Sequence, residues 1–214
     1  MKHIDENYFK NSSNSMANNI RDVISHDEQI LWQGKPKKKA FIISSILKMM
    51  PIALIWLLFD GIFIISFLNN GVGESATTEI SIFIIVFFIF HLTPVWIWLG
   101  NILTANRQHK NLEYVFTNKR IIIKSGIIGI DFQNIYYSDI VSVNLKVGLA
   151  DKLLKVGDIY INCKTGAKVL FDIEDPYFIT SKLQKIVVDI KTDIEYPNEL
   201  RPDENRGYNT RYKD

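Results

Sequence analysis

The feature that most constrains this chain is a pair of long apolar segments near its middle. Residues 49–68 read MMPIALIWLLFDGIFIISFL, and residues 80–99 read ISIFIIVFFIFHLTPVWIWL. A helix needs about 20 mostly apolar residues, at about 1.5 Å of rise each, to cross the hydrocarbon core of a bilayer. A helix packed on a soluble core would carry one apolar stripe and an opposite polar face, and neither segment has a polar face. The sequence predicts a two-helix transmembrane hairpin within residues 41–103, with spans at about 45–68 and 80–101. The alternative is a hairpin buried in the core of a soluble protein.

Charge around the two segments is asymmetric and predicts their orientation. The connecting loop, residues 69–79, has no Lys or Arg and contains two glutamates, whereas basic residues flank both segments on the other side. Because Lys and Arg near span ends mark the cytoplasmic side, we expect a multi-pass protein of the inner or plasma membrane with both termini in the cytoplasm. The flanking cations are either a topology signal alone or a basic cluster that attracts anionic lipid. They are Lys35, Lys37, Lys38, Lys39, Arg107 and Lys110.

Two ionisable residues interrupt the apolar segments. Asp60 lies about 8 residues from the outer end of its segment and His91 about 11 residues from the outer end of its own. Their depths therefore differ by less than about one helical turn, and a hydrogen-bonded pair across the hairpin is geometrically possible. Ionisable groups inside spans often mark ion paths or proton relays. The pair is either a structural contact or part of a relay in a small oligomeric transporter, and no GxxxG pattern or further intramembrane charge supports a conduction path.

The start of the first span is left open by the sequence. Residues 41–47 are also apolar, but Lys48 follows them. The span either begins near Phe41, with the Lys48 side chain extending to the interface, or begins near Met49. Because the first apolar segment lies far from Met1, an ordinary cleaved secretory signal is not expected.

Composition excludes several classes of function. The net charge of +2 is too small to indicate a nucleic-acid partner. The single Cys163 excludes an internal disulfide and a Cys-cluster metal site. None of the GxSxG, HExxH, P-loop or CxxC motifs is present. We therefore assign no catalytic, metal or cofactor-binding residues, expect no cofactor, and expect the chain not to be an enzyme.

After residue 111 the pattern changes to short apolar runs with period-2 alternation, separated by turn residues. This pattern, without crossover helices, predicts an antiparallel meander. Residues 148–155 are predicted to form a loop or a single helical turn. Asp175 and Pro176 predict a helix start, because an N-cap carboxylate is followed by proline at the first helical position. The predicted strands are residues 112–117, 120–125, 128–137, 140–147, 157–163 and 167–173. The helix carries one apolar stripe, made of Ile179, Leu183, Ile186, Val187 and Ile190.

Both ends of the chain are polar and predict little regular structure. Residues 1–27 are predicted to be flexible, with a short amphipathic helix near Ile20 suggested by the spacing of its apolar residues. Residues 28–36 (EQILWQGKP) read as an extended segment ended by Gly34 and Pro36. Residues 193–214 are charged and lack an apolar stripe, so they are predicted to be a disordered tail.

A specific string in the strand-rich part resembles a known family. Tyr114-x-x-Thr117-Asn118-x-Arg120 is followed by Gly126, by IYYSDIVSV over residues 135–143, and by VGDI at residues 156–159. This string resembles the bacterial pleckstrin-homology (PH) domain family, in particular its membrane-anchored YdbS-like group. The resemblance implies an α+β membrane protein in which residues 111–192 form a PH-like antiparallel β-barrel or sandwich capped by the C-terminal helix. It also suggests that residues 28–36 return to pair with an edge of the sheet.

The motif residues themselves predict structure more than chemistry. Asn118 suits a tight turn, and Gly126 and Gly157 relieve backbone strain or allow close approach. Arg120 is expected to pair with Asp139 or Asp158, or to hold a loop carbonyl. The motif residues expected to be structural are Tyr114, Thr117, Asn118, Arg120, Gly126 and Gly157.

These features favour a non-enzymatic interaction module held at the inner leaflet. Its working surface would be an edge of the sheet or the loop at residues 148–155. Besides the lipid bilayer, the expected partner is an unidentified membrane or cytoplasmic protein, or a second copy in a homo-oligomer. The alternative is anionic-lipid sensing by the PH-like domain, although the turn at Asn118, Lys119 and Arg120 lacks the basic cluster that grips phosphoinositides.

Overall fold

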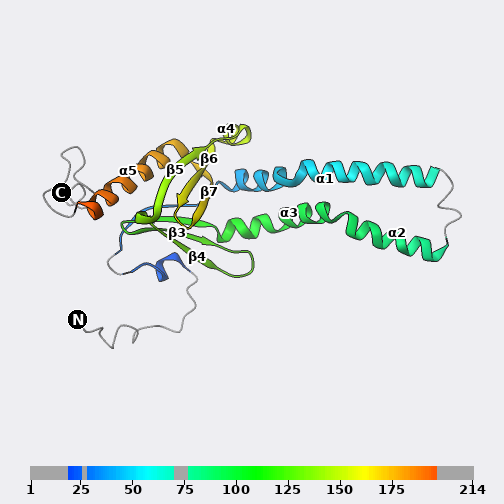
Figure 1. Ribbon diagram of the computed structural model, residues 1–214, viewed down its shortest axis with the longest axis horizontal. Coiled ribbons are helices and arrows are strands. Elements are labelled where there is room, and N and C mark those ends of the chain that lie inside the picture. Colours follow the sequence, from blue (N-terminus) through cyan, green and yellow to red (C-terminus); the bar gives the residue numbers. More distant parts are fainter. Residues whose placement is uncertain (1–18, 26–27, 70–76, 197–214) are drawn as a thin grey trace, which may run out of the picture.

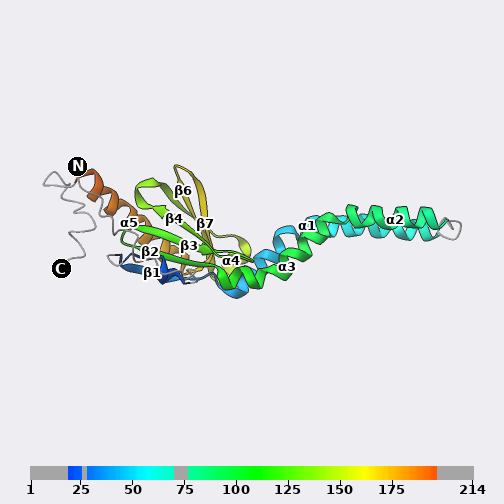
Figure 2. The ribbon, with the colours of Figure 1, turned by 90° about the horizontal axis from the view of Figure 1, so that it is seen from below.

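A lobe of strands and a pair of helical rods make up the molecule (Figure 1). The computed structural model describes residues 19–25, 28–69 and 77–196. The rods are α1 (Lys38–Asn69), which leads away from the lobe, and α2 (Thr78–His91) followed by α3 (Thr93–Asn111), which lead back to it. Seen from the side, the rods extend as one slender projection from the lobe (Figure 2). Helix α1 is continuous through Pro51 and starts upstream of both positions considered for the first span.

The returning rod is bent rather than straight. The axes of α2 and α3 differ by 52° at a break around Leu92, whereas the sequence predicts one uninterrupted span over residues 80–101. Pro94 explains the difference, because its ring clashes with the carbonyl of Phe90 and it has no amide proton for the helical ladder. The hydroxyl of Thr93 donates to the Phe90 carbonyl in its place.

The lobe is a sandwich of two antiparallel sheets and not one closed barrel. The first sheet has the order β1-β2-β3-β4 and the second β5-β6-β7. Strands β1 and β2 are direct neighbours, with Gly34 opposite Tyr114, although the 78 residues from 35 to 112 separate them in the chain. The two rods are therefore inserted into the connection between two paired strands. The strands are β1 (Ile30–Gly34), β2 (Glu113–Thr117), β3 (Arg120–Ser125), β4 (Asp131–Tyr136), β5 (Ile140–Lys146), β6 (Val156–Cys163) and β7 (Gly166–Glu174).

The main core lies between the two sheets and α5 (Pro176–Glu195). Ile121 from the first sheet and Ile159 from the second are fully buried, and Leu183 closes the core from α5. Asp175 does not cap this helix through its side chain. Its backbone is left-handed, with φ of 49° and ψ of 49°, whereas a side-chain cap needs an extended residue at that position. The predicted carboxylate cap is thus wrong, while Pro176 does begin the helix.

Shorter elements complete the lobe. The helix η1 (Ile20–Asp22) is a single 3-10 turn, and Ile20 packs with Val115 and Ile122 in a second, smaller core on the outer face of the first sheet. After η1 the chain does not continue as the predicted N-terminal helix, since Val23 and Ile24 lie in a turn and a bend, and the part of that prediction before residue 19 falls outside the described ranges. The connection between β5 and β6 holds α4 (Leu149–Leu154), and η2 (Tyr137–Asp139) precedes β5. The predicted tail starts too early at residue 193, since α5 continues to Glu195.

Candidate functional site

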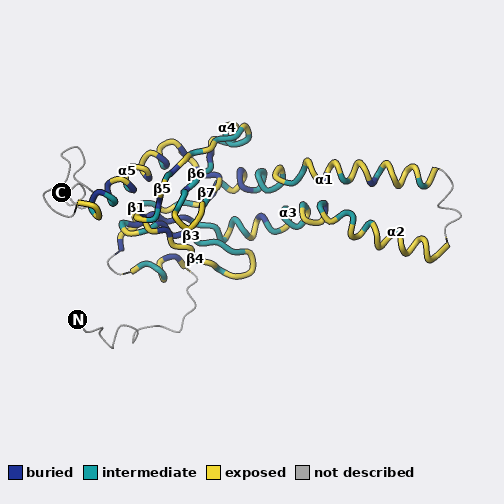
Figure 3. The backbone as a smooth tube through the Cα atoms, in the orientation of Figure 1, coloured by how far each residue is buried: buried dark blue, intermediate teal, exposed yellow. Residues whose placement is uncertain are grey.

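Most residues of the rods are exposed or partly exposed (Figure 3), and many of the exposed ones are large and apolar. Leu58 and Ile62 on α1 are 66% and 68% exposed, and Phe90 on α2 is 74% exposed. Helix α1 is long and apolar enough to cross a membrane, and α2 with α3 meets the same test if the bent pair is one span.

Asp60 and His91 lie side by side between the rods. His91 Nδ1 is 2.9 Å from Asp60 Oδ1, an ion-pair distance that does not meet hydrogen-bond geometry. Asp60 is only 3% exposed, and its Oδ2 has no hydrogen-bond partner among the described residues. The imidazole stacks on Phe87, with ring centroids 5.0 Å apart, and Trp56 lies 5.8 Å away on the same measure. The arrangement isolates a polar contact within aromatic surroundings.

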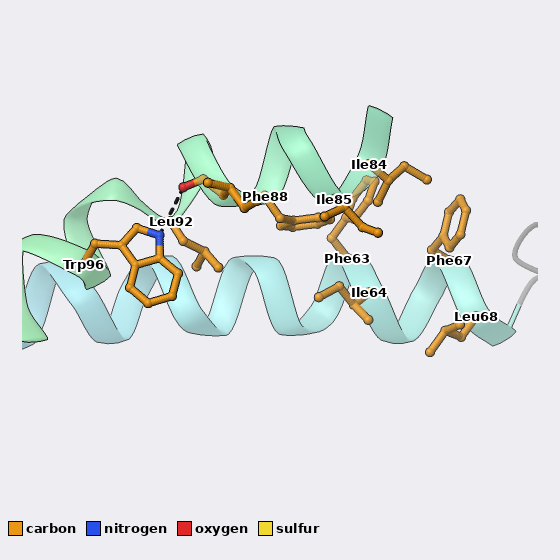
Figure 4. Close-up of a pocket in the computed structure, with 10 residues that line it drawn as sticks. Phe63, Ile64, Phe67, Leu68, Ile84, Ile85, Phe88, Leu92 and Trp96 are labelled. Carbon is orange, nitrogen blue, oxygen red and sulfur yellow. Dashed lines mark hydrogen bonds between the residues drawn. The ribbon is translucent and has the colours of Figure 1, made fainter. Parts of the chain in front are cut away.

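Nearer the far ends of the rods an apolar groove separates α1 from α2 (Figure 4). Its volume is about 440 Å³, and its lining comes from aromatic and aliphatic side chains. Phe63 and Phe67 face it from α1, and Phe88 from α2. The Trp96 indole donates across the bend to the Ile89 carbonyl at 3.1 Å, which leaves the groove without a free polar group to orient a polar ligand.

The predicted basic cluster gathers where the rods join the lobe. Lys37 is partly buried and already engaged, since its Nζ lies 3.0 Å from Glu174 Oε1 and donates to the Leu154 carbonyl at 3.2 Å. Lys37 therefore attaches the start of α1 to the lobe. The other members are exposed: Lys35, Lys38, Lys39, Arg107 and Lys110.

The turn between β2 and β3 holds the chain entering β1. Both Glu28 oxygens accept from Arg120, each at 3.0 Å, and the Thr117 hydroxyl donates to the same carboxylate at 2.7 Å. Glu28 is 8% exposed. Burial works to raise the pKa of Glu28, but the hydrogen bonds from Arg120 and Thr117 outweigh it and lower that pKa. We call these three residues the latch.

The latch corrects the expected partner of Arg120. The guanidinium pairs with Glu28 and not with Asp139 or Asp158, and its Nη2 also donates to the Val23 carbonyl at 3.0 Å. The guanidinium thus makes the expected contact with a loop carbonyl, and it also forms an ion pair with Glu28 that the sequence analysis did not predict. Asn118 extends the same contact, because its side-chain oxygen accepts from the Gln29 amide at 3.0 Å.

The other motif residues also serve packing. The Tyr114 hydroxyl accepts from the Phe171 amide at 3.0 Å and so joins the two sheets, while burial raises the pKa of the phenol. Gly126 has φ of 139°, and a Cβ there would lie 2.0 Å from the Gly129 carbonyl oxygen. At Gly157 a Cβ would press on three side chains at 3.0 Å. The described contacts of the motif are those of a scaffold.

A pair of carboxylates at the junction of rod and lobe escaped the sequence analysis. The Ser44 hydroxyl, on α1, donates to Asp172 Oδ1 at 3.2 Å, and the Asp172 amide donates to Asp158 Oδ1 at 2.9 Å. Asp172 is 2% exposed and has a left-handed backbone with φ of 50°. Burial, and after it the charge of Asp158, raises the pKa of Asp172 to about 6. A pocket of about 390 Å³ opens beside the pair and is also lined by Lys48.

A second apolar groove lies on the lobe, between β1 and α5. Trp32 and Phe116 both line it and pack on each other with ring centroids 4.5 Å apart. Leu31 borders it from β1, and Phe178 and Lys182 border it from α5. The groove has a volume of about 320 Å³, and β1 is an edge strand of its sheet. We call this feature the β1–α5 groove. The proximity of β1 and α5 could not be derived from the sequence, because the 141 residues from 35 to 175 separate them in the chain.

The described residues contain no group of three or more His, Cys, Asp or Glu side chains that could hold a metal ion. The lone Cys163 is partly buried, and burial raises the pKa of its thiol. A thiol with a raised pKa is a poor nucleophile at neutral pH.

Comparison with known proteins identifies the family. No match was found among curated proteins. A solved structure of a DUF1696 family protein with a pleckstrin-homology domain, from Shewanella loihica PV-4, is similar at 18% identity over 36% of this chain and 68% of its own length, with a TM-score of 0.28. The family model described as bacterial PH domain matches residues 42–189, well over half of the sequence, and the chain therefore belongs to the bacterial PH domain family.

Proposed function

We propose that this protein is a membrane-anchored interaction module of the YdbS-like kind, with α1 and the bent α2–α3 rod as two spans and the PH-like lobe in the cytoplasm. In water, the exposed apolar surface of the rods would be an aggregation hazard far larger than the patches that soluble monomers carry. In a bilayer the same surface is solvated by lipid. The basic residues at the lobe end of the rods support the orientation.

Anchoring is tested by fractionation of the full chain. Carbonate-washed membranes should retain the protein, and it should be released by detergent. A protease added to spheroplasts should leave the lobe intact, because both termini face the cytoplasm. Recovery of the full chain in the detergent-free soluble fraction would contradict the proposal.

The proposed binding role of the lobe rests on the β1–α5 groove. An edge strand beside an apolar groove can accept an extended peptide as a further strand, with alternate side chains of the peptide seated in the groove. Lys182, whose Nζ lies 5.5 Å from the Phe178 ring centroid, adds a cation at the rim. The occupant that fits is an extended apolar segment with an acidic flank, supplied by a membrane or cytoplasmic protein. The family is generally non-enzymatic, in keeping with a binding role.

Site-specific photocrosslinking tests the groove. A photoreactive residue replaces Lys182 in the full chain, in native membranes, and a matched probe replaces Lys185, which is exposed on the same helix but does not line the groove. We expect a discrete crosslinked product from position 182 only, and its loss when Leu31→Glu is added. A product of twice the chain mass would identify a second copy as the occupant. The same products from both positions would contradict a specific groove.

A further inference from the structure

Several loops of the lobe gather at the end where the rods join it. Strand β2 starts directly after α3, and Glu113 in β2 pairs with Lys124 near the end of β3. The Asn111 side chain donates to the Gly126 carbonyl at 3.1 Å. The loop between β3 and β4 therefore lies beside the end of α3.

The connection between β5 and β6 lies at the same end. Val156 at the start of β6 pairs with Glu174 at the end of β7, and the Lys37 amide donates to the Asp172 carbonyl at 2.9 Å. Lys37 also reaches the carbonyl of Leu154, the last residue of α4. Figure 1 shows α4 and the β3–β4 loop on opposite sides of the two rods.

These two connections carry the most exposed large apolar side chains of the described residues. Ile128 in the β3–β4 loop is 98% exposed, and Leu149 and Leu153 in α4 are 88% and 85% exposed. Two exposed cations, Lys152 and Lys155, lie beside Leu153. Apolar side chains mixed with lysine are typical of segments that lie in the membrane interface.

Contacts with α1 place this end of the lobe at the interface, since Ser44 donates to Asp172 and Lys48, directly before the apolar segment, lines a pocket together with Asp158. The 32 residues of α1 span about 48 Å at about 1.5 Å per residue, whereas the hydrocarbon core is about 30 Å thick and the bilayer with headgroups about 40–45 Å. The excess lies toward the lobe, over the turns from Lys38 to Lys48, because the far end of the helix is apolar up to Leu68. Helix α4 is held beside these first turns through Lys37.

We infer that Ile128, Leu149 and Leu153 insert into the interfacial layer of the cytoplasmic leaflet, while Lys152 and Lys155 contact anionic headgroups. The lobe is thereby held against the bilayer at two points on either side of the rods. This second membrane contact would fix the direction in which the β1–α5 groove faces. The inference rests on the proposed membrane anchoring of α1 and α2–α3.

The test uses the full chain with Cys163→Ser, reconstituted in nanodiscs of equal amounts of phosphatidylcholine and phosphatidylglycerol. A polarity-sensitive fluorophore is attached in turn at Ile128→Cys, Leu153→Cys and Ile62→Cys. The matched control is Thr165→Cys, because Thr165 is the exposed tip of the β6–β7 turn at the opposite end of the lobe. Emission and quenching by spin-labelled lipid are measured for each, after gel filtration shows the same elution for all variants.

We expect labels at 128 and 153 to show blue-shifted emission and several-fold stronger quenching by lipid than the label at 165. Strong quenching at 62 together with values at 128 and 153 equal to those at 165 would overturn the inference and leave the anchoring intact. Weak quenching at 62 would overturn the anchoring, and the inference with it. In the mixed nanodiscs, the double variant Lys152→Gln with Lys155→Gln should reduce the lipid quenching of the label at 153. In nanodiscs of phosphatidylcholine alone, the same double variant should leave that quenching unchanged.

Discussion

Large aliphatic residues are buried in the lobe but exposed on the rods. Ile121 and Ile159 in the lobe are fully buried, whereas Leu58 and Ile62 in α1 are about two-thirds exposed. In the lobe, burial removes apolar surface from water at a gain of about 25 cal/mol per Å². The rods obtain no comparable gain from their contacts with each other, and in the proposed membrane-anchored state lipid would surround their apolar side chains. A charge placed at an equally exposed position should therefore have a different free-energy cost in the rods and in the lobe.

The sharpest way to break this comparison is to place charge at equally exposed positions of both regions. Leu58→Arg with Ile62→Arg puts two cations near the middle of α1, where each costs roughly 2.5–3.5 kcal/mol of insertion free energy. We expect the pair to cost roughly 5–7 kcal/mol and to abolish carbonate-resistant membrane association. The control is Val141→Arg with Val188→Arg, at lobe positions that are 65% and 54% exposed. The control should keep membrane association and change the stability of the lobe by less than about 1 kcal/mol. Equal outcomes for the two double variants would remove the distinction between the regions.

Two ion pairs of different burial sharpen the comparison within the lobe. In the latch, the side chains of Arg120 and Glu28 are 13% and 1% exposed, whereas those of Lys37 and Glu174 are 36% and 63% exposed. Arg120→Ala leaves the Glu28 carboxylate buried without its cation, a change that costs about 3–5 kcal/mol. Glu174→Ala removes an exposed pair that contributes about 0–1 kcal/mol.

Denaturant unfolding of the detergent-solubilised chain measures both variants, followed by the fluorescence of Trp32 in a background in which Trp56, Trp96 and Trp98 are replaced by phenylalanine. We expect Arg120→Ala to lower the midpoint several times more than Glu174→Ala, and to expose β1 to proteolysis near Ile30. Arg120→Lys should recover only part of the loss, since an ammonium cannot make the two-pronged contact of the guanidinium. A latch variant as stable as Glu174→Ala would show that the motif serves something other than holding β1.

Local patterns in the sequence were enough to predict most strands of the lobe and its C-terminal helix. Period-2 alternation placed β2, β3 and β5 within about one residue of their observed bounds, and the apolar stripe through Leu183 placed α5. The third predicted strand began too early, at residue 128, because Gly126 and Gly129 form a loop that the alternation of isoleucines concealed. Pro94 was a visible signal for the bend at Leu92 and was outweighed by the hydropathy of the whole segment.

Long-range side-chain contacts were beyond the reach of the sequence. The family resemblance did suggest that residues 28–36 pair with an edge of the sheet, as β1 does with β2, but it did not indicate the contact between Glu28 and Arg120, which lie 92 residues apart. The contact between Asp158 and Asp172, at the junction of α1 and the lobe, was not predicted, because it brings together β6 and β7 beside Ser44 of α1. Contacts between segments far apart in the chain are thus the ones that a pattern-based analysis misses.

That junction gives the smallest expected effect. The pKa of Asp172 is raised to about 6 by burial and by Asp158, whereas an unperturbed aspartate has a pKa near 3.9. Between about pH 4 and 6 the folded state therefore binds more protons than the unfolded state. The contribution of this carboxyl to stability is present at low pH and is lost as the pH rises through about 6.

Asp172→Asn removes the charge and keeps a side chain that accepts a hydrogen bond from Ser44 and tolerates the left-handed backbone. We expect the variant to be more stable than the wild type above pH 7, by at most about 3 kcal/mol, and to lose part of the decline in stability that the wild type shows between about pH 4 and 6. The control is Asp175→Asn, which changes an exposed aspartate with the same backbone conformation, φ of 49°. Thermal unfolding in detergent at a series of pH values measures all three proteins. Parallel curves for Asp172→Asn and the wild type would show that the contact between α1 and the lobe is insensitive to this carboxylate, and that rod and lobe are more independent than their shared hydrogen bonds indicate.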